Sequence, residues 1–200
     1  MNPRAVEKAR SRIRVAEKAL SELVGCPDYA SFTDTWYTFL VAAKNVYTAL
    51  EQGAKSSAQS RQWFGAIKEA RRNDELLQYL FQARDDDEHG LNEITRLEGS
   101  SVGIGKGAHG YSNNVTVHNL RIENGQIINC DVESNDGKPV LIETRGPRAV
   151  LSPIIGRGPV IYQPPTKHEG IDIQDRTPLG VATLGLAYLS TLVDKAATLA

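Results

Sequence analysis

The densest group of side chains that could do chemistry lies between residues 73 and 90, NDELLQYLFQARDDDEHG. It contains Arg84, then four consecutive acidic residues, then His89. An arginine binds phosphate oxygens through paired hydrogen bonds, and a histidine can move a proton near neutral pH. Together they suit cleavage of a phosphodiester, with His89 as the general base and Arg84 stabilising the charge that builds on the phosphate.

This stretch has the pattern of one helix, with Asn73 as its cap and Gly90 just after its end. Its apolar residues recur at helical spacing: Leu76, Leu77, Leu80 and Phe81. At about 100° per residue, Arg84 and His89 lie roughly 140° apart, so an unbroken helix does not place them on one face. They converge if the last turn loosens or if a second copy of the helix supplies the partner. In the alternative interpretation, Arg84 forms salt bridges with its acidic neighbours and His89 caps the last carbonyls.

Arg84, the polar Asp85 directly after it, and His89 after four intervening residues resemble the Arg-(Asn/Asp/His)-x-x-x-His motif of the HEPN superfamily. The wider stretch from Trp63 through the LLQYLFQARDDDEH run is similar to HEPN-like helical proteins of bacteria. The resemblance covers the first half of the chain. It implies a four-helix bundle, a two-fold homodimer that joins two motifs, and a metal-independent RNase without a cofactor. Asp85 would then orient Arg84.

The acidic run between Arg84 and His89 leaves two other functions open. Four carboxylates repel an RNA backbone, which favours a non-catalytic HEPN-like module that binds a protein or another ligand, with Arg84 paired to its neighbours. Alternatively, Asp85 and His89 share a helix face at i and i+4 and hold a divalent cation. A metal-dependent hydrolase would add Asp86 and Glu88 to that pair.

Composition indicates an ordinary globular protein: 200 residues with a formal net charge of −1 exert no global attraction on nucleic acid. The first twenty residues are nevertheless strongly positive, which predicts a solvated charged face or, as the alternative, a local RNA backbone contact. Their basic residues are Arg4, Lys8, Arg10, Arg12, Arg14 and Lys18. Cys26 and Cys130 have no metal-ligand spacing, and there is no signal-peptide or membrane-spanning run. We therefore expect a cytoplasmic protein that does not enter a membrane.

Four helices should occupy residues 1–98 as an antiparallel bundle. The first is capped by Asn2, begins at Pro3 and runs to Val24. The second runs from Asp28 or Ser31 to Gly53, and the third carries residues 63–72 after a loop over 52–60. Residues 73–90 form the fourth, which a weak pattern at Leu91, Ile94 and Leu97 would extend.

The second half has a different character. A glycine-rich linker follows Glu98, and its Gly105-Lys106 pair lacks the remaining residues of a phosphate-binding loop. From Asn114 the apolar residues alternate, and the turn signals Asn124-Gly125 and Asp136-Gly137 predict an antiparallel meander within residues 99–176. Residues 177–200 form a final helix with Thr177 as cap and Pro178 at its first position, which packs back on the bundle or the sheet. The fold class is therefore α+β.

The histidines of this second half share no recurrent metal-ligand spacing, so we expect exposed loop or strand residues: His109, His118 and His168.

Overall fold

The computed structural model describes residues 1–200 except 90–92, 105–109, 125 and 156–159, and the side chains of 87–89 and 126. It is an α+β protein with two compact units, residues 1–96 with 151–200 and residues 97–150. The first unit contains the helices: α1 (Pro3–Leu23), α2 (Tyr29–Ala54), α3 (Ala58–Asn73), α4 (Glu75–His89) and α5 (Pro178–Ala197). Short antiparallel strand pairs make up most of the remaining regular structure.

The predicted caps Asn2 and Thr177 are confirmed, the first of the two predicted starts of the second helix is the observed one, and the predicted cap of the fourth helix needs a correction. Side-chain oxygens of Asn2, Asp28 and Thr177 accept backbone N–H groups at the starts of α1, α2 and α5. The cap of α4, however, is Asp74, whose carboxylate accepts the N–H of Leu77 at 2.9 Å. The prediction of Asn73 was wrong, because Asn73 continues α3 and the extended backbone that a cap needs begins at Asp74.

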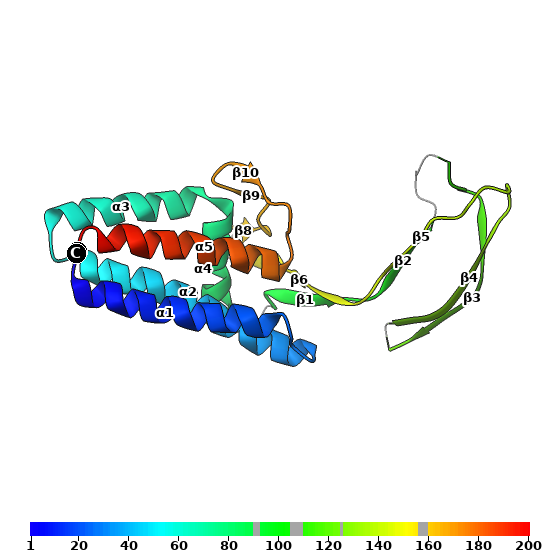
Figure 1. The fold of residues 1–200 in the computed structure, drawn as a ribbon, viewed down its shortest axis with the longest axis horizontal. Helices are drawn as coiled ribbons and strands as arrows, with labels where there is room; N and C mark the ends of the chain where they lie inside the picture. The colour runs from blue at the N-terminus through cyan, green and yellow to red at the C-terminus, as the bar shows by residue number, and fades with distance from the viewer. Residues whose placement is uncertain (90–92, 105–109, 125, 156–159) are drawn as a thin grey trace. The chain divides into compact units, whose positions relative to one another are not determined.

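Small residues let α1 and α2 approach closely. At Gly53 of α2, a Cβ would lie 2.4 Å from the Cβ of Ala5. Helix α5 runs beside α1 and α2 (Figure 1) and buries Leu189, Leu192 and Val193 in a core cluster that both helices share. Each such side chain contributes about 1.5–3 kcal/mol when it is fully buried. The last helix of the chain is therefore part of the main helical core.

Helix α4 packs against segments that follow the second unit. A second core cluster joins α4 side chains to Ile154 of β7 (Ile154–Ile155) and to Ile173, which directly follows β10 (Ile171–Asp172). Strand β7 pairs with β8 (Ile161–Tyr162). The hydroxyl of Tyr79 donates to the carbonyl of Ser152 at 2.8 Å. Strand β1 (Thr95–Glu98) pairs with β6 (Arg148–Leu151), so the predicted extension of the α4 helix through Ile94 and Leu97 was wrong.

The second unit contains two separate strand pairs. Strands β3 (Val115–Glu123) and β4 (Gln126–Ser134) form the hairpin expected at Asn124-Gly125, and Asn124 has a φ of +50°. The second predicted hairpin was wrong, because β5 (Ile142–Arg145) pairs with β2 (Ser101–Ile104) instead of β4. The carbonyl of Pro139 accepts the N–H of Ser112, which draws the chain away from β4.

This second unit also lacks a core of its own. Among its described residues no apolar side chain is buried, and Leu120, Ile122 and Ile128 are more than half exposed. Two-stranded ribbons are marginal when isolated, because one side of each strand has no partner. The predicted meander is therefore replaced by ribbons that contribute nothing to the two core clusters.

Candidate functional site

The structure brings Arg84 and Asp85 together in one polar network. The Asp85 carboxylate accepts hydrogen bonds from Lys44 of α2 and, at 3.3 Å, from Nη1 of Arg84. The Arg84 side chain is 19% exposed. Burial opposes ionisation of Asp85, but the hydrogen bond and charge of Lys44, followed by those of Arg84, outweigh it and lower the pKa of Asp85. The Arg84 charge therefore faces a carboxylate.

The side chain of His89 lies outside the described residues, as do those of Asp87 and Glu88. The convergence of Arg84 with His89 accordingly stays a prediction, and so does a metal site built on the acidic run. Among the side chains that the structure describes, no three histidine, cysteine or acidic residues lie together in a way that would hold a metal ion.

The basic side chains next to this network form cation–π contacts with aromatic rings. The Arg71 guanidinium lies 3.8 Å from the centre of the Phe81 ring and 5.2 Å from that of Tyr47. Lys44 lies 4.9 Å from the centre of the same Phe81 ring. Burial lowers the pKa of Arg71. Cation–π contacts of this kind hold the basic side chains near Arg84 in place by packing.

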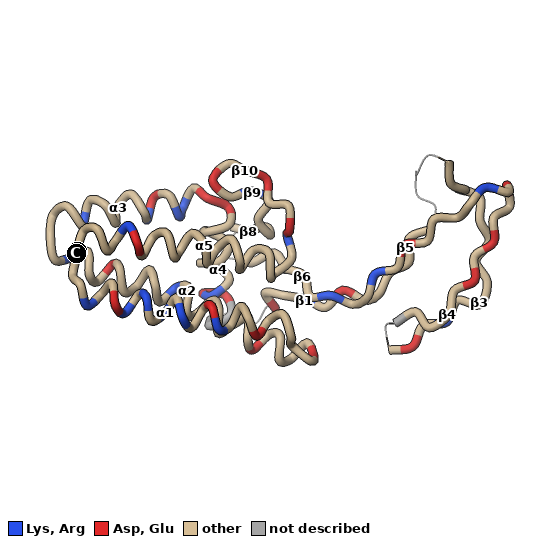
Figure 2. The backbone as a smooth tube through the Cα atoms, in the orientation of Figure 1, with Lys and Arg blue, Asp and Glu red and all other residues tan. Residues whose placement is uncertain are grey.

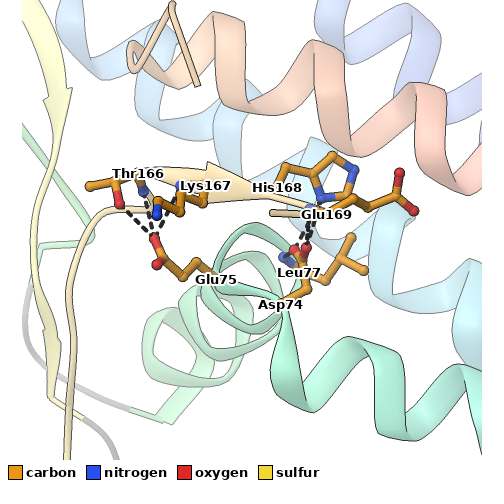
Figure 3. A network of polar contacts seen from close by, with 7 residues as sticks. All are labelled: Asp74, Glu75, Leu77, Thr166, Lys167, His168 and Glu169. Atoms are coloured by element: carbon orange, nitrogen blue, oxygen red, sulfur yellow. Dashed lines mark hydrogen bonds and ion pairs between the residues drawn. The ribbon is translucent and has the colours of Figure 1, made fainter. Parts of the chain in front are cut away.

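The two carboxylates at the start of α4 hold the hairpin of β9 (Lys167–His168) and β10 (Ile171–Asp172), as Figure 3 shows. Glu75 accepts the N–H of Thr166 at 2.9 Å, its hydroxyl at 2.8 Å and the N–H of Lys167 at 3.1 Å. The hydrogen bonds from Thr166 lower the pKa of Glu75.

Asp74 binds the other end of this hairpin. Its carboxylate accepts the N–H of Glu169 at 2.7 Å and contacts Nδ1 of His168 at 3.1 Å. The His168 side chain is only 14% exposed, so the prediction of an exposed residue was wrong for His168. His118 on β3 is exposed as predicted, and His109 lies outside the described residues. Sequence reasoning missed this contact, because its partners are more than ninety residues apart.

A separate groove of about 330 Å³ lies between α1 and α2. Arg4, Lys8 and Arg12 line its α1 side at intervals of four residues, which places them along one helix face. The α2 side supplies uncharged polar groups: Asn45, Thr48 and Gln52. Figure 2 shows how basic residues recur along α1.

The basic residues of this groove differ from the others on α1. Arg10 lies 3.9 Å from the Asp194 carboxylate, and Lys18 lies 3.7 Å from that of Glu22. Within the described part of the chain, the three groove residues are in no ion pair, and no acidic side chain lines the groove. We call this set, Arg4, Lys8 and Arg12 with the polar residues of α2, the basic groove. It can attract and hydrogen-bond an anion.

The helices and the sequence as a whole were also compared with what membrane spans and known proteins require. None of the helices described is both long enough and apolar enough to cross a membrane. No family model matches this chain, and neither the curated proteins nor the solved structures contain a match to it.

Proposed function

We propose that the protein is a binding module that holds the phosphate backbone of single-stranded RNA in the basic groove. In this proposal α1 to α4 form a HEPN-like bundle to which α5 is added, and the Arg84 network serves structure. The observation that carries it is a set of three basic side chains that have no acidic partner among the described residues and that lie next to three uncharged polar ones. The proposal develops the local RNA contact that the N-terminal charge suggested.

The spacing of these charges favours an extended polyanion. Residues four apart on a helix are separated by about 6 Å along its axis, so Arg4, Lys8 and Arg12 span roughly 12 Å. Charges spread over that length can meet successive phosphates, whereas a single small anion would contact one or two of them. Lys55 adds a positive charge beside the basic groove, because its Nζ donates a hydrogen bond at 2.9 Å to the side chain of Gln52, which lines the groove.

The uncharged residues of α2 suit the same ligand. Amide and hydroxyl groups commonly bind phosphate and sugar oxygens, which positions a strand without reading its sequence. Asn45 and Thr48 face this groove, and the Thr48 hydroxyl otherwise donates only weakly, at 3.2 Å, to the carbonyl of Lys44. Binding through these groups should therefore be insensitive to base sequence.

The groove is tested by fluorescence anisotropy with a labelled single-stranded uridine oligonucleotide at several salt concentrations. Three phosphate contacts predict that log K falls with log salt with a slope of about −2. The variant R4Q/K8Q/R12Q should lose most of the binding and most of this slope. The control R10Q/R14Q/K18Q removes the same charge from the same helix and should bind nearly as well as the unmodified protein. Equal losses in both variants would contradict the groove.

The metal-independent RNase remains the second candidate function. It is favoured by the hydrogen bond between Arg84 and Asp85, which is the contact expected if Asp85 orients the arginine. It requires a homodimer, since one copy supplies one Arg84 and one His89. Cleavage of the same oligonucleotide in excess EDTA, abolished by R84A and H89A with the dimer intact, would establish it. Cleavage abolished by EDTA would instead support the metal-dependent hydrolase.

A further inference from the structure

A cavity of about 470 Å³ lies between the β9–β10 hairpin and the first turns of α5. Residues of one short segment, 168–184, line it, and its volume falls in the range of small-molecule sites. Apolar side chains form most of its surface: Ile171, Ile173, Leu179 and Leu184. Ile173 is buried in the core, whereas Ile171 is 72% exposed and borders the opening.

Carboxylates supply the charge of this cavity. Glu169, Asp172 and Asp175 line it, and neither lysine nor arginine is among the described residues that do. Asp175 is used locally, because it accepts the N–H and the hydroxyl of Thr177. In the described part of the chain the side chains of Glu169 and Asp172 form no hydrogen bond or ion pair, although Lys167 is opposite Asp172 in the β9–β10 register.

We propose that this cavity binds a small organic cation, an ammonium group on an apolar body. Glu169 and Asp172 would bind the ammonium, and Ile171, Ile173 and Leu184 would cover the body. An anionic ligand would be repelled, and a neutral apolar ligand would remove water from the carboxylates without replacing it. A ligand with an ammonium group and an apolar body pairs with the carboxylates and at the same time covers the apolar side chains of the cavity.

The hairpin that forms one wall is fixed before any ligand arrives. Asp74 accepts the N–H of Glu169 and Glu75 accepts that of Thr166, so the residues on both sides of β9 are bonded to α4, and β10 is held by its pairing with β9. Glu169 has a φ of +50° and Gly170 one of +79°, which closes the turn tightly. A wall ordered in advance lowers the entropy lost on binding.

The test is an amide NMR titration of the full chain with two matched probes, phenylbutylammonium and the neutral phenylbutanol. The ammonium should produce saturable shifts at residues 168–184 and bind about tenfold more tightly than the alcohol, because two carboxylates contribute to one ligand. Equal affinities for the two probes, absence of saturation, or shifts centred elsewhere would overturn the proposal.

Variants separate this site from a general effect of charge. E169Q/D172N should weaken the ammonium about tenfold and leave the alcohol unchanged, since the apolar surface remains. It should also fold normally, because Asp74 binds the backbone and not the side chain of Glu169. The control E17Q/D34N removes two exposed carboxylates from α1 and α2 and should leave both affinities unchanged. An equal loss in the control would refute the assignment.

Discussion

Asp74 should be one of the most sensitive positions for the stability of the helical unit. Its carboxylate, 11% exposed, accepts the N–H of Leu77 as the cap of α4, accepts the N–H of Glu169 and contacts His168. Loss of a cap costs about 1 kcal/mol, and hydrogen bonds to a charged group contribute about 1.5–3 kcal/mol each. Since water replaces part of these bonds in a variant, we expect D74A to lower the free energy of unfolding by about 3 kcal/mol.

Urea unfolding followed by circular dichroism measures this difference, with N73A as the matched control. Among the described residues, the Asn73 side chain donates to Glu69 alone, on the exposed surface of α3, so N73A should cost less than about 0.5 kcal/mol. D74N keeps an oxygen for the cap but loses the charge that faces His168, and should fall between the two. Equal effects of D74A and N73A, or a larger effect of N73A, would refute the assignment of cap and hairpin contact to Asp74.

Three further predictions concern packing, the second unit and pH. G53A should destabilise the protein by about 1–3 kcal/mol in thermal melts, because its Cβ meets Ala5, whereas G65A in open space on α3 should stabilise it by up to about 1 kcal/mol. Replacing residues 98–149 with a short glycine linker should leave helicity and melting temperature nearly unchanged, since neither core cluster contains those residues; loss of cooperative melting would contradict this. The pKa of Glu75 is lowered from its ordinary 4.5, so its stabilisation is present above that pH and disappears as the pH falls through the folded value. The destabilisation by E75Q should therefore shrink between pH 7 and strongly acidic pH, and an effect that grows there would be inconsistent with the lowered pKa.

Local signals in the sequence predicted the parts of the fold that need only local partners. The caps at Asn2, Asp28 and Thr177 bind N–H groups within three residues, so their chemistry is complete in a short peptide segment. The turn at Asn124 is similar, because it requires a positive φ that asparagine tolerates. These caps and this turn therefore form independently of how the rest of the chain is packed.

Signals that depend on a distant partner were less informative. The chain does bend at Asp136-Gly137, with a φ of +70° at Gly137, but the strand after the bend pairs with β2, more than thirty residues earlier. Leu97 fits a helical pattern, yet it lies in strand β1, because the backbone of β6 supplies hydrogen-bond partners for this segment. The spacing of apolar residues alone does not indicate whether a segment will continue a helix or pair with a distant strand.

The sequence by itself determined the helical first half, the final apolar helix, the α1 charge and the adjacency of Arg84 and Asp85. Only the tertiary structure decided what those groups contact. Lys44, forty-one residues before Asp85, reaches that carboxylate because α2 packs on α4. Likewise, the packing of α1 against α2 and α5 pairs Arg10 with Asp194 and leaves Arg12 lining the basic groove. Charge is a property of each residue, whereas its availability depends on which neighbours the packed helices bring within reach.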